Sequence, residues 1–152
     1  MIRPALAAIA LAAAPALAAA QDITRVATDK SVVQAADALA ATIEPAGITL
    51  FARVNHGKGA RMVDADIGEA QLLIFGTPKV GTPALIDNRL AGIMLPLRVL
   101  VYEDEDGQTW LAYHAPADML SGLHGITADA PYVRTMTKAL ANFTARAAGQ
   151  AE

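Results

Sequence analysis

Hydrophobic residues along the chain recur with two different periods. Between Ile48 and Asn55 every second side chain is apolar, which is the period of a half-buried strand, and Phe51 is the exception. Shorter apolar runs typical of strands occupy residues 23–27, 71–75, 97–103 and 108–114. The segment Asp104-Glu105-Asp106-Gly107 joins the last two, and its Asp-Gly pair is a strong hairpin signal. The pattern therefore predicts five strands.

Helical periods fill the intervals between these strands. A capping box of Ser31 and Gln34 begins the first helix, whose apolar face is Val32, Ala36, Leu39 and Ile43. We expect a short helix at residues 57–66, with Met62 and Val63 turned inward, one turn around residues 85–90, and another short helix at 116–124. A last helix opens at Pro131 and ends at Gly149, with the apolar stripe Val133, Met136, Leu140, Phe143 and Ala147.

This order of elements predicts an α+β fold with two layers. The sheet is expected to be mixed or antiparallel, with about five strands and with the helices packed on one face. The first 20 residues have the features of a secretory signal peptide: a basic Arg3, an apolar run from Ala5 to Ala14, and small residues at the cleavage site. We therefore expect one domain over residues 21–152.

Composition narrows the cellular location and the classes of function expected for this protein. The chain has no cysteine, so a lipidated cysteine after the signal is excluded, and we expect a periplasmic or secreted protein without stable membrane insertion after cleavage. It carries 12 Lys+Arg against 15 Asp+Glu with no basic stripe, which argues against nucleic acid as a partner. With only two serines and no G-x-G-x-x-G motif, acyl-enzyme chemistry and a dinucleotide are not expected. We expect no cofactor.

The stretch LLIFGTPKVGTPAL, residues 72–85, combines a buried strand with a loop rich in glycine and proline. A phosphate-binding P-loop needs lysine directly after its second glycine, but here Thr82 follows Gly81 and the lysine is Lys79. Nucleotide binding is therefore not expected. Two interpretations of the loop are left. It is a structural turn, or it is a site where Lys79, Thr82 and the Gly81 N–H bind a small anionic or polar ligand.

Asn55 and His56 end another strand and give a second candidate site. If that strand lies beside the one before Lys79, His56 would share a pocket with the lysine, which would favour the neutral imidazole of a general base. An enzyme of this kind is one alternative, although we assign no catalytic residue. A copper or zinc site formed by His56, His114 and His124 is another, but no two histidines have a recognised ligand spacing.

Four segments together resemble the family known as domain of unknown function 302. They are GITLFARVNHGKGA, LLIFGTPKVGTPAL, LPLRVLVYEDEDGQTWLAYHAPADML and LHGI, and the resemblance runs from about Ile48 to Ile126. It implies a small α+β domain, often exported, similar to members that form homodimers, and it implies no activity. His56, Lys79, Gly81, Thr82 and His124 match residues that recur in this family.

These observations give one set of candidate ligand-binding residues. The set is Asn55, His56, Lys79, Gly81, Thr82 and His124. A homodimeric binding protein for a small anionic or polar molecule is the leading hypothesis, and a domain that only contacts a protein partner is a further alternative.

Overall fold

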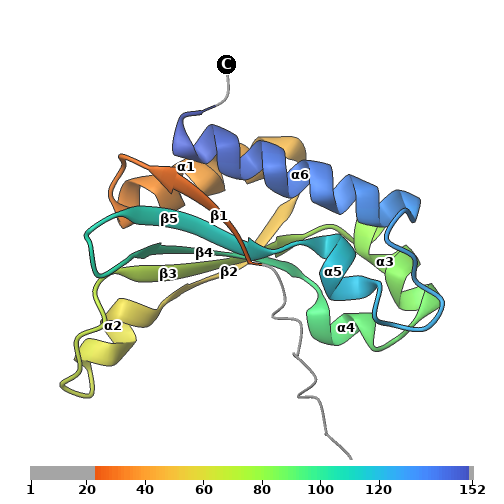
Figure 1. Ribbon diagram of the computed structural model, residues 1–152, viewed down its shortest axis with the longest axis horizontal. Coiled ribbons are helices and arrows are strands. Elements are labelled where there is room, and N and C mark those ends of the chain that lie inside the picture. The colour runs from red at the N-terminus through yellow and green to blue at the C-terminus, as the bar shows by residue number, and fades with distance from the viewer. Residues whose placement is uncertain (1–22, 151–152) are drawn as a thin grey trace, which may run out of the picture.

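A five-stranded antiparallel sheet forms the centre of the molecule (Figure 1). The computed structural model describes residues 23–150, so the predicted signal peptide lies outside the described residues. The order across the sheet is β1-β5-β4-β3-β2. The strands are β1 (Ile23–Thr28), β2 (Thr49–Asn55), β3 (Ala70–Gly76), β4 (Leu97–Glu103) and β5 (Thr109–His114). The α+β prediction is confirmed, and every strand pair is antiparallel.

The helices lie mainly on one face of this sheet and at its two ends. They are α1 (Val32–Ile43), the 3-10 turn η1 (Glu44–Ala46), α2 (His56–Arg61), α3 (Pro78–Asp87), α4 (Ala91–Met94), α5 (Pro116–Leu120) and α6 (Pro131–Ala148). The capping box at Ser31 is formed as predicted, because Ser31 and Gln34 each accept from the other's backbone N–H. Gly149 ends α6 in the left-handed conformation, with φ of 82°.

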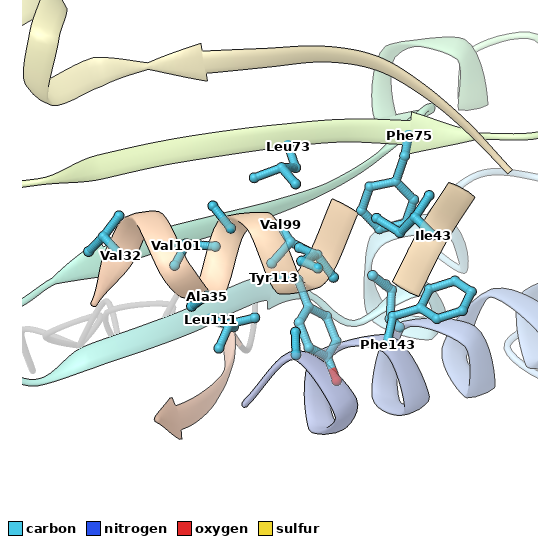
Figure 2. Close-up of a cluster of buried hydrophobic side chains, with 14 residues drawn as sticks. Val32, Ala35, Ile43, Leu73, Phe75, Val99, Val101, Leu111, Tyr113 and Phe143 are labelled. Carbon is cyan, nitrogen blue, oxygen red and sulfur yellow. The ribbon is translucent and has the colours of Figure 1, made fainter. Parts of the chain in front are cut away.

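The main core lies between the sheet and the helices α1 and α6. Alternate residues of β3, β4 and β5 point toward α1, as Figure 2 shows, and their side chains are almost fully buried. The rings of Phe75 and Phe143 meet edge to face, with centroids 6.3 Å apart. This contact joins the end of β3 to α6.

The opposite face of the sheet is less covered. In the part of the chain that the structure describes, no helix lies across its centre (Figure 1), and Leu72, Ile74 and Leu100 there are only partly buried. Trp110 is on this face, 4.1 Å from the guanidinium of Arg25 and hydrogen-bonded through its indole N–H to Asp104. That hydrogen bond is the main reason why the pKa of Asp104 lies below its ordinary value.

Four local predictions were wrong, and the simplest is the short helix expected at residues 116–124, which ends at Leu120. The helix expected at residues 57–66 ends at Arg61, and Met62 and Val63 point outward, with 78% and 74% of their surfaces exposed. The segment expected to be a loop with one turn near residue 85 is the helix α3, because Pro78 suits a first helical position. The fourth concerns the alternation in β2.

A bulge at Phe51 explains the exception in the hydrophobic pattern of β2. The register with β3 shifts between Leu50 and Ala52, so that Leu50 packs toward the core whereas Val54 lies on the open face. Alternation alone predicted that Leu50 and Val54 share a face, but the bulge places them on opposite faces of the sheet. Phe51 itself is left 54% exposed.

Leu73 provides a test of the core. Its side chain is fully buried, so Leu73→Ala is expected to reduce the free energy of unfolding by about 2–5 kcal/mol. The matched change Leu90→Ala, at a side chain that is 57% exposed, should alter it by less than about 0.5 kcal/mol. Urea unfolding of the two variants measures the difference, and similar losses would contradict the placement of the core.

A hydrogen bond ties α6 to α3. The Tyr132 hydroxyl donates to the Asp87 carboxylate over 2.6 Å. Partial removal from water, this hydrogen bond and the negative charge of Asp87 together raise the pKa of Tyr132 to about 12. The protonated tyrosine is thus favoured by the folded state, since an unfolded tyrosine has a pKa of about 10.

The raised pKa predicts a specific loss of stability in alkali. The contribution of the bond should be complete below pH ~10 and should disappear as the pH rises toward 12. The stability advantage of the native chain over Tyr132→Phe should therefore shrink across this range in urea unfolding. An ultraviolet titration should show one late-ionising tyrosine, absent in Tyr132→Phe and earlier in Asp87→Asn. An unchanged titration in Asp87→Asn would contradict the assignment.

Candidate functional site

A cavity of about 400 Å³ lies where β2, β3 and β4 meet α3 and α6. This volume is within the range of small-molecule sites. Among the described residues, no charged side chain lines it, and the hydroxyls of three threonines are its only side-chain polar groups. The lining residues are Ile48, Phe51, Phe75, Gly76, Thr77, Pro78, Val80, Gly81, Thr82, Leu85, Gly92, Leu95, Pro96, Leu97, Thr135, Met136, Ala139 and Phe143.

The walls of this cavity come from segments far apart in the sequence. The edge-to-face pair of Phe75 and Phe143 belongs to the lining and also to the main core. Phe51 and Leu85 are 54% and 37% exposed, so they mark the side on which the cavity meets solvent. The site therefore has a rigid inner part formed by core residues and an apolar rim.

Three glycines leave room in the wall. A Cβ added at Gly81 would lie 3.9 Å from the Leu95 side chain, and one at Gly92 would lie 3.3 Å from that of Leu85. A Cβ at Gly76 would lie 3.7 Å from the Phe51 ring. Since each of these neighbours also lines the cavity, side chains at the glycines would reduce the space.

The predicted residues of α3 are only partly in this site. Gly81 and Thr82 line the cavity, whereas Lys79 is exposed in the first turn and is not part of the lining. The Gly81 N–H donates to the Thr77 carbonyl over 3.0 Å as a helical hydrogen bond. It is therefore not the free donor for an anion that the sequence predicted for a loop.

Asn55 and His56 lie at the other end of the sheet. Asn55 pairs with Gln71 at the start of β3, whereas Lys79 follows the end of β3 at Gly76. Gln71 and Gly76 are five positions apart along β3, which corresponds to a distance of about 17 Å. Figure 1 shows α2 and α3 at opposite ends. The hypothesis of His56 and Lys79 in one pocket was therefore wrong.

Asn55 has a structural role. Its side chain accepts a hydrogen bond of 2.7 Å from the Lys58 N–H and so caps α2, and His56 is the exposed first residue of that helix. A general base assisted by Lys79 has no support from this arrangement, because the two side chains are not neighbours.

His124 lies at a third place. Its carbonyl accepts a hydrogen bond of 3.0 Å from the Asn88 side chain, just after the C-terminus of α3, while Lys79 is at the N-terminus of that helix. The imidazole is exposed. Within residues 23–150, no three side chains of His, Cys, Asp or Glu gather as a metal site would require. The alternative of a metal held by the three histidines therefore finds no support.

Most residues of the cavity carry no signal in the sequence. Phe51 interrupts the apolar alternation of β2, which is visible in the sequence. The sequence does not show that this interruption is a bulge that places Phe51 at the cavity. Thr135 and Ala139 of α6 lie beside the apolar stripe that defines the buried face of this helix, and no pattern marked them. Their proximity to α3 is a property of tertiary packing.

Comparisons with known proteins show two kinds of similarity. The curated "Fluoride-specific ion channel FluC 1" of Brucella suis and that of Brucella abortus are each 35% identical to this chain over 121 residues. The match covers 78% of this chain but only 47% and 44% of those proteins, so the chain spans less than half of their length. No helix within the described residues has the length and hydropathy of a membrane span.

A solved structure shares the fold. An uncharacterized conserved DUF302 protein from Bacillus stearothermophilus superposes with a TM-score of 0.66 at 17% identity, covering 88% of this chain and all of that one. The family model described as domain of unknown function DUF302 matches residues 24–143, which is most of the chain and nearly the whole described fold. The extent of that match shows that this chain belongs to the DUF302 family.

Proposed function

We propose that this protein binds a small molecule with an apolar body in the cavity between α3, α6 and the sheet. The observation that carries the proposal is a space of about 400 Å³ with no charged side chain in its lining. Burial of apolar surface is the main favourable term available there. The hydroxyls of Thr77 and Thr82 can bind a single polar group of the ligand, and that of Thr135, which donates to the Pro131 carbonyl over 2.8 Å, can only accept from it.

The apolar lining changes the class of ligand expected from the sequence. A small anion would lose its hydration in this cavity without gaining a charged partner, which is unfavourable. Lys79 is outside the lining but on the same helix, so it can at most interact with a polar group that remains in solvent. The preferred ligand is therefore an apolar or amphipathic organic molecule.

Gly81→Leu is the most informative variant. Its Cβ would face the Leu95 side chain, so the leucine would occupy the cavity, and replacing a glycine inside a helix should maintain or increase stability. In a thermal-shift screen of aliphatic and aromatic molecules, a ligand at 100 times its dissociation constant should stabilise the native chain by about 2.7 kcal/mol. This stabilisation should be absent in Gly81→Leu.

Two further variants serve as controls. Gly59→Leu makes the same change in α2, where a Cβ would have no neighbour within 4 Å, and should retain the response. Gly81→Ala fills less of the cavity than Gly81→Leu and should retain part of the stabilisation by ligand. Sodium fluoride belongs in the screen because of the names of the curated relatives. Stabilisation by fluoride alone, or equal responses of Gly81→Leu and the native chain, would contradict an apolar site.

We also propose that the protein is exported and forms a homodimer. Export rests on the character of residues 1–20. The open face of the sheet supports the second proposal, because Leu72, Ile74 and Leu100 are apolar and partly exposed there. A second copy packed on this face would bury these side chains.

Trp110 makes this proposal measurable, since it is the single tryptophan of the chain and lies on the open face. Dilution should shift its emission to longer wavelength in step with dissociation seen by analytical ultracentrifugation. Leu100→Arg should give a monomer at all concentrations, whereas Val33→Arg, on an exposed part of α1, should not. A dimer unaffected by Leu100→Arg would place the interface elsewhere.

A further inference from the structure

Four aliphatic side chains form an exposed patch beside the cavity. Leu85, Ile86, Leu90 and Ile93 lie between the last turn of α3 and α4, with 37%, 77%, 57% and 69% of their surfaces exposed. We call this group the α3–α4 patch. An exposed group of large aliphatic side chains that adjoins a cavity is typical of an interaction surface.

The patch is continuous with the rim of the cavity. Leu85 belongs to both, and Gly92, between Leu90 and Ile93, also lines the cavity. A Cβ at Gly92 would lie only 3.3 Å from the Leu85 side chain, so the end of α3 and the start of α4 are in close contact. A molecule leaving the cavity on this side would meet aliphatic side chains.

The stretch of sequence that contains the patch has a net charge of opposite sign to that of the whole chain. Residues 79–98 contain Lys79, Arg89 and Arg98 against the single acid Asp87, a balance of 3 − 1 = +2, while the whole chain carries −3. Asp87 accepts the hydrogen bond of Tyr132. Arg98 is held at α4 by hydrogen bonds of 3.2 and 3.3 Å to the carbonyls of Ile93 and Met94.

We propose that the α3–α4 patch docks on an anionic lipid bilayer and that the ligand of the cavity is a lipid acyl chain taken up there. The second part rests on the proposed function of the cavity. Aliphatic side chains flanked by arginines suit the boundary between headgroups and acyl chains. The docking is peripheral and leaves the fold intact.

Vesicle binding tests the docking surface. Residues 21–152 are used, because every described element and both core clusters lie within residues 23–150. The protein should co-sediment with mixed phosphatidylcholine and phosphatidylglycerol vesicles and bind phosphatidylcholine alone less tightly. The double change Ile86→Gln and Ile93→Gln should weaken binding at least about tenfold, since both side chains would no longer enter the interface. Arg89→Gln should weaken binding only to the anionic vesicles.

A matched control removes exposed aliphatic side chains elsewhere. Val63→Gln with Ile67→Gln, at side chains 74% and 56% exposed in the loop after α2, should bind vesicles like the native chain. Equal binding by the two double variants, or no binding by the native protein, would overturn the proposal. So would self-association that depends on Ile86 and Ile93 without vesicle binding, because the patch would then be a protein interface.

Measuring fatty acid binding separately from vesicle docking distinguishes a failure of the cavity proposal from a failure of the docking proposal. Soluble fatty acids of increasing length should bind about fourfold more tightly per methylene, equivalent to ~0.8 kcal/mol, until the cavity is full. Gly81→Leu should abolish this binding and leave vesicle docking unchanged. Fatty acid binding without docking would overturn the docking surface alone. Docking without fatty acid binding, in the native chain, would overturn the acyl chain as ligand.

Discussion

The packing of α1 and α6 against one face of the sheet is the interaction on which the other features depend. It buries Leu73, Phe75 and Val99, and it fixes α6 at the height where Phe143 meets Phe75. α3 then rests against α6, and the space between α3, α6 and the sheet is the cavity. Because both helices occupy the same face, no comparable layer covers the opposite face within residues 23–150.

The cavity exists because glycines in its wall leave space that the surrounding backbone does not close. Gly76, Gly81 and Gly92 provide no side chain at three points of the wall. The rings of Phe75 and Phe143, which also line the cavity, belong to the core. A close-packed interior normally contracts around such gaps, since voids cost dispersion contacts. Here the strand ends and Pro78, at the first position of α3, fix the backbone. The space is therefore maintained by the scaffold itself.

The fold was predictable from the sequence, but of the residues that line the candidate cavity only Gly81 and Thr82 were predicted. The period of apolar residues located the five strands and both long helices, since those patterns reflect burial on one face. The same reasoning failed for α3, because Gly81 and Pro83 are poor helix formers that tertiary packing overrides. His56 and Lys79 each follow the end of a strand, which is why a shared pocket was expected, yet the antiparallel register of β2 and β3 places them at opposite ends of the sheet. Thr135 and Ala139 had no signal at all.

The pairing of β1 with β5 has a consequence for the time at which the domain can fold. β1 is the first described strand, and its partner ends at His114. Hydrogen bonds from Thr28 and Lys30 to the carbonyls of Ala148 and Ala147 join residues about 120 positions apart in the sequence. Closing such long loops precedes any gain from the contacts, which slows folding. The sheet and the contacts of its first described strand therefore cannot be completed until nearly all of the chain has been synthesised.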